Sequence, residues 1–158
     1  MRLIKVFLAS LILCSALCPA MLSAQSKGTV LIVAEKTRFK KMLVAELDSL
    51  FTAAGYETTI VENSKKDLGN YAASDYDAVF ITNSGVNSRV RPWIVTWIDQ
   101  NRSSGTYILL HTTQIRDWTV ETPVDAVTSA SSKDDVQKLA QEYFQRILRE
   151  LEKADQAG

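Results

Sequence analysis

Polar residues that could take part in chemistry gather in three segments, each of which follows a short apolar run. These segments are Glu35 to Lys40, Asn83 to Asn87 and His111 to Trp118. His111 is the only histidine of the chain. A lone histidine at the end of a strand can act as a proton donor, but it is more often a partly buried side chain with a satisfied hydrogen bond. Both interpretations stay open.

The sequence contains few partners for His111. The two cysteines, Cys14 and Cys18, lie in the N-terminal apolar segment, so the rest of the chain offers no cysteine and no second histidine for a metal site. The nucleophile motif Gly-x-Ser-x-Gly does not occur. We therefore predict no metal ligands and no catalytic residues of a recognisable hydrolase.

The N-terminus has the pattern of a cleavable signal peptide. Arg2 and Lys5 precede a nearly unbroken apolar run from Val6 to Leu17, which is shorter than the roughly 20 residues that span a bilayer. A small residue, Ala24, marks the cleavage site. We predict that residues 1–24 are removed and that the protein is exported, to the periplasm or beyond. A lipoprotein signal is the minor alternative.

Cleavage would leave residues 25–158 without cysteine and therefore without a disulfide. Two of the 18 basic residues and none of the 18 acidic residues would be lost, so the mature net charge is 16 − 18 = −2. A nearly neutral chain without a basic cluster in its sequence is a poor nucleic-acid binder. No second apolar run is long enough to span a membrane. We predict no nucleic-acid partner and no membrane span in the mature chain.

Strands and helices are predicted to alternate along residues 25–158. Apolar, β-branched runs indicate strands, and residues that recur at helical spacing indicate helices. The expected strands are Thr29 to Ala34, Glu57 to Val61, Asp77 to Thr82, Thr106 to Leu110 and Asp125 to Thr128. The expected helices run from Thr37, as the cap, to Gly55, irregularly within Asn63 to Ser74, from Pro92 to about Asn101, and from Asp134 to Lys153.

Such alternation predicts right-handed parallel crossovers and one three-layer α/β domain. In an open parallel sheet, ligands bind at the carboxyl ends of the strands, near the point where the strand order switches. The three polar segments are all expected at that edge of the sheet. This argument locates a site without naming its ligand.

Three stretches carry a resemblance to the flavodoxin-like family over nearly all of the mature chain. VLIVAEKTRFKKMLVAEL is similar to the first strand, phosphate loop and first helix, DLGNYAASDYDAVFITNSG to the third strand with its flavin loop, and VRPWIVTWIDQN to the helix after it. The resemblance implies a doubly wound, five-stranded parallel sheet with strand order 2-1-3-4-5. It also implies non-covalent FMN, electron transfer and a redox partner protein.

The phosphate loop departs from the family pattern, which reads roughly Ser/Thr-x-Thr-Gly-x-Thr. Laid on Glu35 to Lys40, only Thr37 matches; Arg38 replaces the glycine, and Glu35 brings a negative charge. The cations of the segment could compensate by charge. The alternative is a solvated helix start that Thr37 caps. The cofactor-binding residues that the resemblance implies are Lys36, Thr37, Arg38, Phe39, Asn83, Ser84, Gly85, Thr112, Thr113 and Trp118, of which Trp118 could stack on the flavin ring.

Two further resemblances are weaker. Asp125 to Ser131 resembles the motif of FMN-binding domains in which the last hydroxyl carries a covalently attached flavin, here Ser131; the alternative is a strand followed by a Ser131 or Ser132 helix cap. The stretch from Gly105 to His111 also resembles the ThuA-like fold.

The leading hypothesis is an exported FMN-binding electron-transfer protein, and the alternative is a flavodoxin-like binding module without cofactor that acts through protein contacts.

Overall fold

The computed structural model describes residues 26–85, 89–113, 120–130 and 132–157. The predicted signal peptide, Trp118 and Ser131 lie outside these residues. The five strands are β1 (Thr29–Ala34), β2 (Glu57–Glu62), β3 (Ala78–Ser84), β4 (Tyr107–Thr113) and β5 (Asp125–Ser129). The helices are α1 (Arg38–Ala53), α2 (Lys65–Leu68), the 3₁₀ turn η1 (Ala73–Asp75), α3 (Pro92–Asn101) and α4 (Val136–Ala157).

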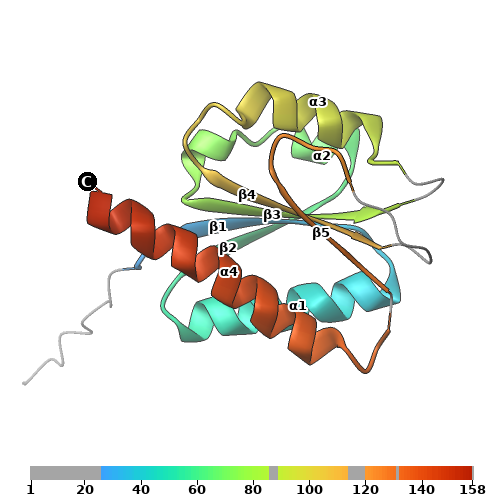
Figure 1. Cartoon of the computed structure of the whole chain (residues 1–158), viewed down its shortest axis with the longest axis horizontal. Coiled ribbons are helices and arrows are strands. Elements are labelled where there is room, and N and C mark those ends of the chain that lie inside the picture. Colours follow the sequence, from blue (N-terminus) through green and yellow to red (C-terminus); the bar gives the residue numbers. More distant parts are fainter. Residues whose placement is uncertain (1–25, 86–88, 114–119, 131, 158) are drawn as a thin grey trace, which may run out of the picture.

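All five strands are parallel and form one sheet in the order β2-β1-β3-β4-β5. Helices α1 and α4 cover one face, and α2 and α3 cover the other (Figure 1). The predicted three-layer sheet and its strand order are therefore confirmed. Because α1 and α3 start where β1 and β3 end, the carboxyl ends of the strands and the first turns of these helices share one edge, which we call the carboxyl edge.

Strands β3 and β4 are longer than predicted. Their ladder continues through Thr82–His111 and Asn83–Thr112 to the pair Ser84–Thr113. Thr82 was expected as the last residue of its strand, but Asn83, Ser84 and residues 111–113 were expected in loops, so the predicted strand ends are wrong at this point. Because these residues are polar, the sequence shows no apolar run that would indicate a strand there. In the fold, however, the adjacent parallel strand hydrogen-bonds to their backbone groups and keeps them extended.

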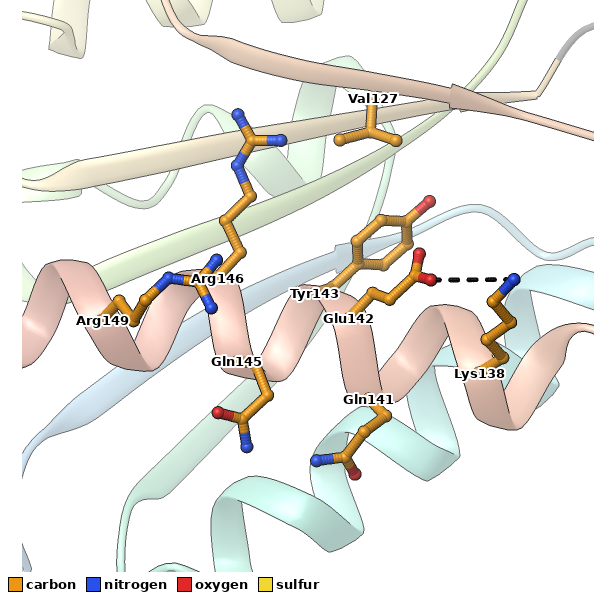
Figure 2. A pocket seen from close by; sticks show the side chains of 8 residues that line it. All are labelled: Val127, Lys138, Gln141, Glu142, Tyr143, Gln145, Arg146 and Arg149. Atoms are coloured by element: carbon orange, nitrogen blue, oxygen red, sulfur yellow. Dashed lines mark ion pairs between the residues drawn. The ribbon is translucent and has the colours of Figure 1, made fainter.

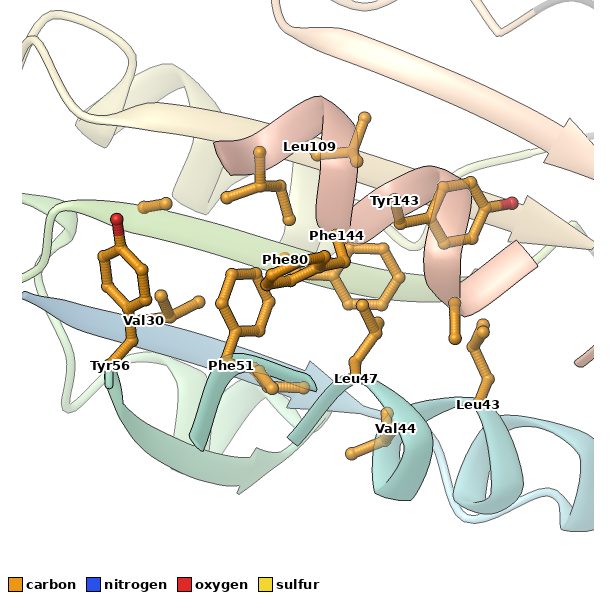
Figure 3. Close-up of a cluster of buried hydrophobic side chains, with 14 of the residues drawn as sticks. Val30, Leu43, Val44, Leu47, Phe51, Tyr56, Phe80, Leu109, Tyr143 and Phe144 are labelled. Carbon is orange, nitrogen blue, oxygen red and sulfur yellow. The ribbon is translucent and has the colours of Figure 1, made fainter. Parts of the chain in front are cut away.

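Each face of the sheet has its own hydrophobic core. Under α1 and α4, Phe51 meets Phe144 edge to face with ring centroids 5.1 Å apart, and Phe80 contacts Tyr143 (Figure 3). Under α3, the core includes Ile94, Trp97 and Ile98. Trp97 packs there against the sheet, and only 5% of it is exposed. Met42 of α1 is exposed.

The last helix starts later than predicted. It begins at Val136, so Ser132 lies four residues before the first helical residue and does not cap it. The strand part of the Asp125 to Ser131 prediction is confirmed, because Asp125–Ser129 is β5. Across the residues that the structure describes, no helix combines the length and the apolar character that crossing a bilayer requires.

Candidate functional site

A buried ion pair lies at the carboxyl ends of β1 and β3. Glu35 follows β1 directly, and Lys40 comes from the first turn of α1, which places the Lys40 Nζ 3.0 Å from the Glu35 Oε2. The hydroxyl of Ser84, the last residue of β3, donates to the same carboxylate oxygen. The side chain of Lys40 is 1% exposed and that of Glu35 12%. We call Glu35, Lys40 and Ser84 the ionic cluster.

Burial and pairing act in opposite directions on these groups. Burial lowers the pKa of Lys40 to about 8, although the Glu35 carboxylate favours the charged amine. Burial alone would raise the pKa of Glu35, but the hydrogen bond from Ser84 and the charge of Lys40 outweigh it and hold that pKa below its usual value. Glu35 is therefore an anion at neutral pH.

The backbone near Glu35 is also occupied by internal hydrogen bonds. The Glu35 N–H donates to the Thr82 Oγ1 at 2.8 Å, and the Thr82 hydroxyl donates to the Val33 carbonyl at 3.2 Å. Thr37 caps α1, as predicted, with the Lys40 N–H 3.4 Å from its Oγ1. Two N–H groups of this segment, those of Glu35 and Lys40, are therefore already hydrogen-bonded within the protein.

These residues do not fit the phosphate of FMN. Backbone N–H groups at a helix start attract an anion, but here the Glu35 carboxylate lies between β1 and β3 and neutralises Lys40. Two like unit charges about 4 Å apart repel by about 4 kcal/mol at an effective dielectric constant of about 20. A phosphate beside Glu35 would meet this repulsion and would not find Lys40 free.

The segment after β3 is shaped by Asn83. Its side chain is fully buried, donates to the Arg89 carbonyl at 3.2 Å and accepts from the Arg91 N–H at 3.1 Å. This holds Arg91 with its guanidinium 5.6 Å above the ring centre of Trp93 and its Nε 3.8 Å from a Glu35 oxygen. The Trp93 ring is fixed in turn by its N–H, which donates to Asn63 at 2.8 Å.

At the carboxyl ends of β4 and β5 the polar groups are neutral. The His111 Nε2 lies 2.9 Å from the Ser129 Oγ, and the hydroxyls of Thr112 and Thr128 are 3.1 Å apart. The His111 ring is fully buried and stacks on Phe80. Burial, with the nearby charge of Lys40, lowers the pKa of His111 to about 3, so the imidazole is neutral at pH 7. We call His111, Thr112, Thr128 and Ser129 the neutral cluster.

The pair of His111 and Ser129 has the spacing of a base and a nucleophile, and sequence analysis missed it because the two residues are 18 positions apart. A base with a pKa of about 3 accepts protons poorly at neutral pH. Among the described residues, the His111 Nδ1 has no hydrogen-bond partner that would orient the ring. We infer that the Nε2–H donates to Ser129, because the opposite tautomer would bury an unpaired N–H. The pair thus joins β4 to β5.

The start of the edge strand β5 is held by a second set of contacts. Asp125 accepts from the Tyr107 hydroxyl at 2.8 Å and from Arg146 of α4 at 2.9 Å. Alongside, an open groove of about 540 Å³ runs between Val127 and the polar face of α4, with Tyr143 at its base (Figure 2). Tyr143 also contacts His111, with ring centroids 5.2 Å apart, so the groove adjoins the neutral cluster.

The predicted cofactor-binding residues therefore lie in three different settings. Phe39, Asn83 and Thr112 are buried in the protein. Lys36 and Arg38 are exposed, with Lys36 paired to Glu62 at 2.7 Å, while Thr37 is the helix cap. Ser84, Gly85 and Thr113 end the β3–β4 ladder, with the Gly85 N–H bonded to the Thr113 carbonyl at 2.9 Å, and Trp118 is outside the described residues. Among the described residues, no group of three or more His, Cys, Asp or Glu could hold a metal ion.

This chain resembles known proteins in its three-dimensional structure. No family model and no curated protein sequence matches the chain. The solved structures that resemble it include the flavodiiron protein from Giardia intestinalis (TM-score 0.56, 12% identity, 79% of this chain and 37% of that one). They also include a flavodoxin from the domain Archaea (TM-score 0.52, 7% identity, 77% of this chain and 97% of that one).

The fold is flavodoxin-like. At 12% and 7% identity, this likeness shows the fold and not the ligand. The flavodoxin-like chain spans little more than a third of the flavodiiron protein but nearly all of the archaeal flavodoxin. An orphan response regulator of H. pylori is a further neighbour, with a TM-score of 0.49, 17% identity, and 78% of this chain and 99% of that one covered.

Proposed function

We propose that this flavodoxin-like domain is a binding module that works without FMN and acts through protein contacts at its carboxyl edge. The observation that carries the proposal is the ionic cluster, in which the Glu35 carboxylate occupies the crevice between β1 and β3 and already pairs with Lys40 and Ser84. Exposed Lys36 and Arg38 and half-exposed Arg91 lie at the same edge, where a partner can reach them.

The test is a titration of FMN with the chain from Gln25 to Gly158, which contains the whole folded domain. We expect colourless protein and undiminished FMN fluorescence at micromolar protein. Yellow protein, or quenching that saturates in this range, would refute the proposal. Glu35→Gln is the informative variant: removal of the negative charge should increase affinity for inorganic phosphate, whereas Glu62→Gln, at an exposed pair, should not.

The second candidate is the FMN-binding electron carrier. Its supporting observations are the flavodoxin-like fold and the cations of the first turn of α1, where no acidic residue occurs. A flavin held there would supply the redox chemistry, and the chain would orient its ring. Recovery of yellow protein with a reversible two-electron reduction would favour this candidate. Flavin that survives denaturation and disappears in Ser131→Ala would show covalent attachment.

We also propose that the module acts outside the cytoplasm, on the strength of the N-terminal pattern. Expression of the full chain should yield protein whose first residue is Gln25, which N-terminal mass spectrometry identifies. A chain that keeps residues 1–24 in the cytoplasm would contradict this proposal.

A further inference from the structure

Charges of opposite sign are separated between the two edges of the sheet. The carboxyl edge has seven exposed or half-exposed cations near the ends of β1, β2 and β3, which we call the basic surface. Only two exposed or half-exposed acidic residues, Glu62 and Asp67, lie among them, so the sum near these three strands is 7 − 2 = +5 over the described residues, since Glu35 and Lys40 cancel. Lys133, Asp134 and Asp135, which follow β5, bring the sum for the whole edge to 8 − 4 = +4. The basic surface consists of Lys36, Arg38, Lys41, Lys65, Lys66, Arg89 and Arg91.

The opposite edge is acidic. It contains the first residues of the strands and the C-terminal parts of α3 and α4, and its described charged residues sum to 5 − 8 = −3. The acidic residues are Glu57, Asp75, Asp77, Asp99, Asp125, Glu150, Glu152 and Asp155, and the basic ones are Lys27, Arg102, Arg146, Arg149 and Lys153. The chain is therefore nearly neutral overall, but one edge of the sheet is positively charged and the other is negatively charged.

Helix stability does not explain this arrangement. The N-terminal end of a helix dipole favours acidic residues and its C-terminal end favours basic ones, by roughly 0.3 to 1 kcal/mol each. Helix α1 instead has Arg38 and Lys41 in its first turn and no acidic residue there, and α4 has no basic residue in its last turn. Charges that oppose the dipole reinforce the positive potential of the carboxyl edge, which indicates a role in binding an anion.

The side chains of the basic surface favour a protein over a lipid or a nucleic acid. Arg91 over Trp93 offers two residue types that are enriched in protein interfaces. The carboxylates of Glu62 and Asp67, interspersed among the cations, would repel a continuous phosphate backbone. An acidic protein segment can place its charges between them.

We propose that the basic surface is the docking face for an acidic protein segment, rich in Asp and Glu, with Arg91 over Trp93 as its anchor. This inference rests on the proposed function and names the chemical class of the partner. Because charge steers the encounter and is screened by salt, binding should weaken steeply with ionic strength.

The experiment measures anisotropy of a fluorescent peptide of alternating Glu and Ser with the chain from Gln25 to Gly158. The triple variant Arg38→Gln/Lys41→Gln/Arg89→Gln changes only exposed residues and should weaken binding at least tenfold. The matched control Lys27→Gln/Arg102→Gln/Lys153→Gln removes the same charge from the acidic edge and should change it less than twofold. Arg91→Lys keeps the charge but not the planar contact with Trp93, and should weaken binding about threefold.

Equal losses in the two triple variants would overturn the inference, because binding would then depend on net charge alone. So would tighter binding to anionic vesicles or to single-stranded DNA than to the peptide. Self-association at low salt that Arg38→Gln/Lys41→Gln/Arg89→Gln abolishes, and that the control variant does not weaken, would identify a second copy as the occupant and also overturn it. The FMN titration tests the proposed function alone. Binding of FMN would refute that function, but it would not show whether the acidic peptide binds to the basic surface.

Discussion

At the carboxyl ends of β1 and β3 the buried polar groups are ions, whereas at the ends of β4 and β5 they are hydroxyls and a neutral imidazole. Both clusters lie at the same edge and both join neighbouring strands or loops. A buried ion pair depends on both partners, since removal of one leaves an uncompensated charge. The neutral cluster depends on hydrogen bonds and on the exclusion of protons. The two regions should therefore fail in different ways.

The largest effect should come from Glu35→Leu, which leaves Lys40 buried without its partner. We expect the free energy of unfolding in urea to fall by about 3 to 5 kcal/mol. Lys36→Ala is the matched control, because it breaks the exposed pair with Glu62 and should change stability by less than about 1 kcal/mol. Equal, small changes in both variants would show that the ionic cluster behaves like a surface pair.

Acid should destabilise the neutral cluster before it reaches the ionic one. His111 has a lower pKa in the folded protein, about 3, than in the unfolded chain, where it is about 6.5, so its contribution is complete above pH 6.5 and is lost as the pH falls toward 3. Between pH 6.5 and 5 we expect a loss of about 2 kcal/mol in the free energy of unfolding.

The control for this titration is His111→Phe, whose stability should be nearly independent of pH in that window, whatever its absolute value. Glu35, with a folded pKa below its usual value, contributes stability above its unfolded pKa and loses it only at lower pH. If His111→Phe retains the slope between pH 6.5 and 5, another group is responsible and the comparison of the two clusters fails.

A smaller effect is expected for Ser129→Ala. The hydroxyl that accepts from the His111 Nε2–H would be lost, but Ser129 is half-buried and water can partly replace it, so we expect a loss of about 1 kcal/mol. The Nε2 proton should also shift or broaden in the NMR spectrum of the variant. Thr128→Val, which breaks only the contact with Thr112, should leave that proton signal unchanged.

The smallest effect should follow from Thr37→Ala. The N-cap hydrogen bond is long, at 3.4 Å, so its loss should lower the free energy of unfolding by about 0.5 kcal/mol, as measured in urea. Thr52→Ala, at an exposed position near the end of α1, is the control and should be neutral. A loss above about 2 kcal/mol would mean that Thr37 also positions the ionic cluster.

Much of the fold could be predicted from local pattern. The residues Thr29–Ala34 were predicted as β1 with both bounds correct, and Pro92 begins α3 as expected. The errors in the predicted strand bounds lie where polar residues extend a strand beyond its apolar run. His111, Thr112 and Thr113 belong to β4 because β3 and β5 pair with them on both sides, which no local signal shows.

The candidate site was only partly predictable. The carboxyl edge follows from the alternation of strands and helices, and Glu35 was recognised as an obstacle to phosphate. Its contact with Ser84 joins residues 49 positions apart, and that of His111 with Ser129 joins residues 18 apart. Sequence spacing does not encode such contacts, because the strand order and register create them.

By itself the sequence determined the layers and the helix that Thr37 caps, since each follows from periodicity and from the residue types at element ends. The strand order was implied by the resemblance to the flavodoxin-like family. Only the tertiary structure decided which charged and polar groups lie at the carboxyl edge and which of them are paired. Folding paired Glu35 with the buried Lys40, and it neutralised His111 by burial. It also gathered cations from three separate segments of a nearly neutral chain into one surface, because parallel strands bring all their carboxyl ends to the same edge.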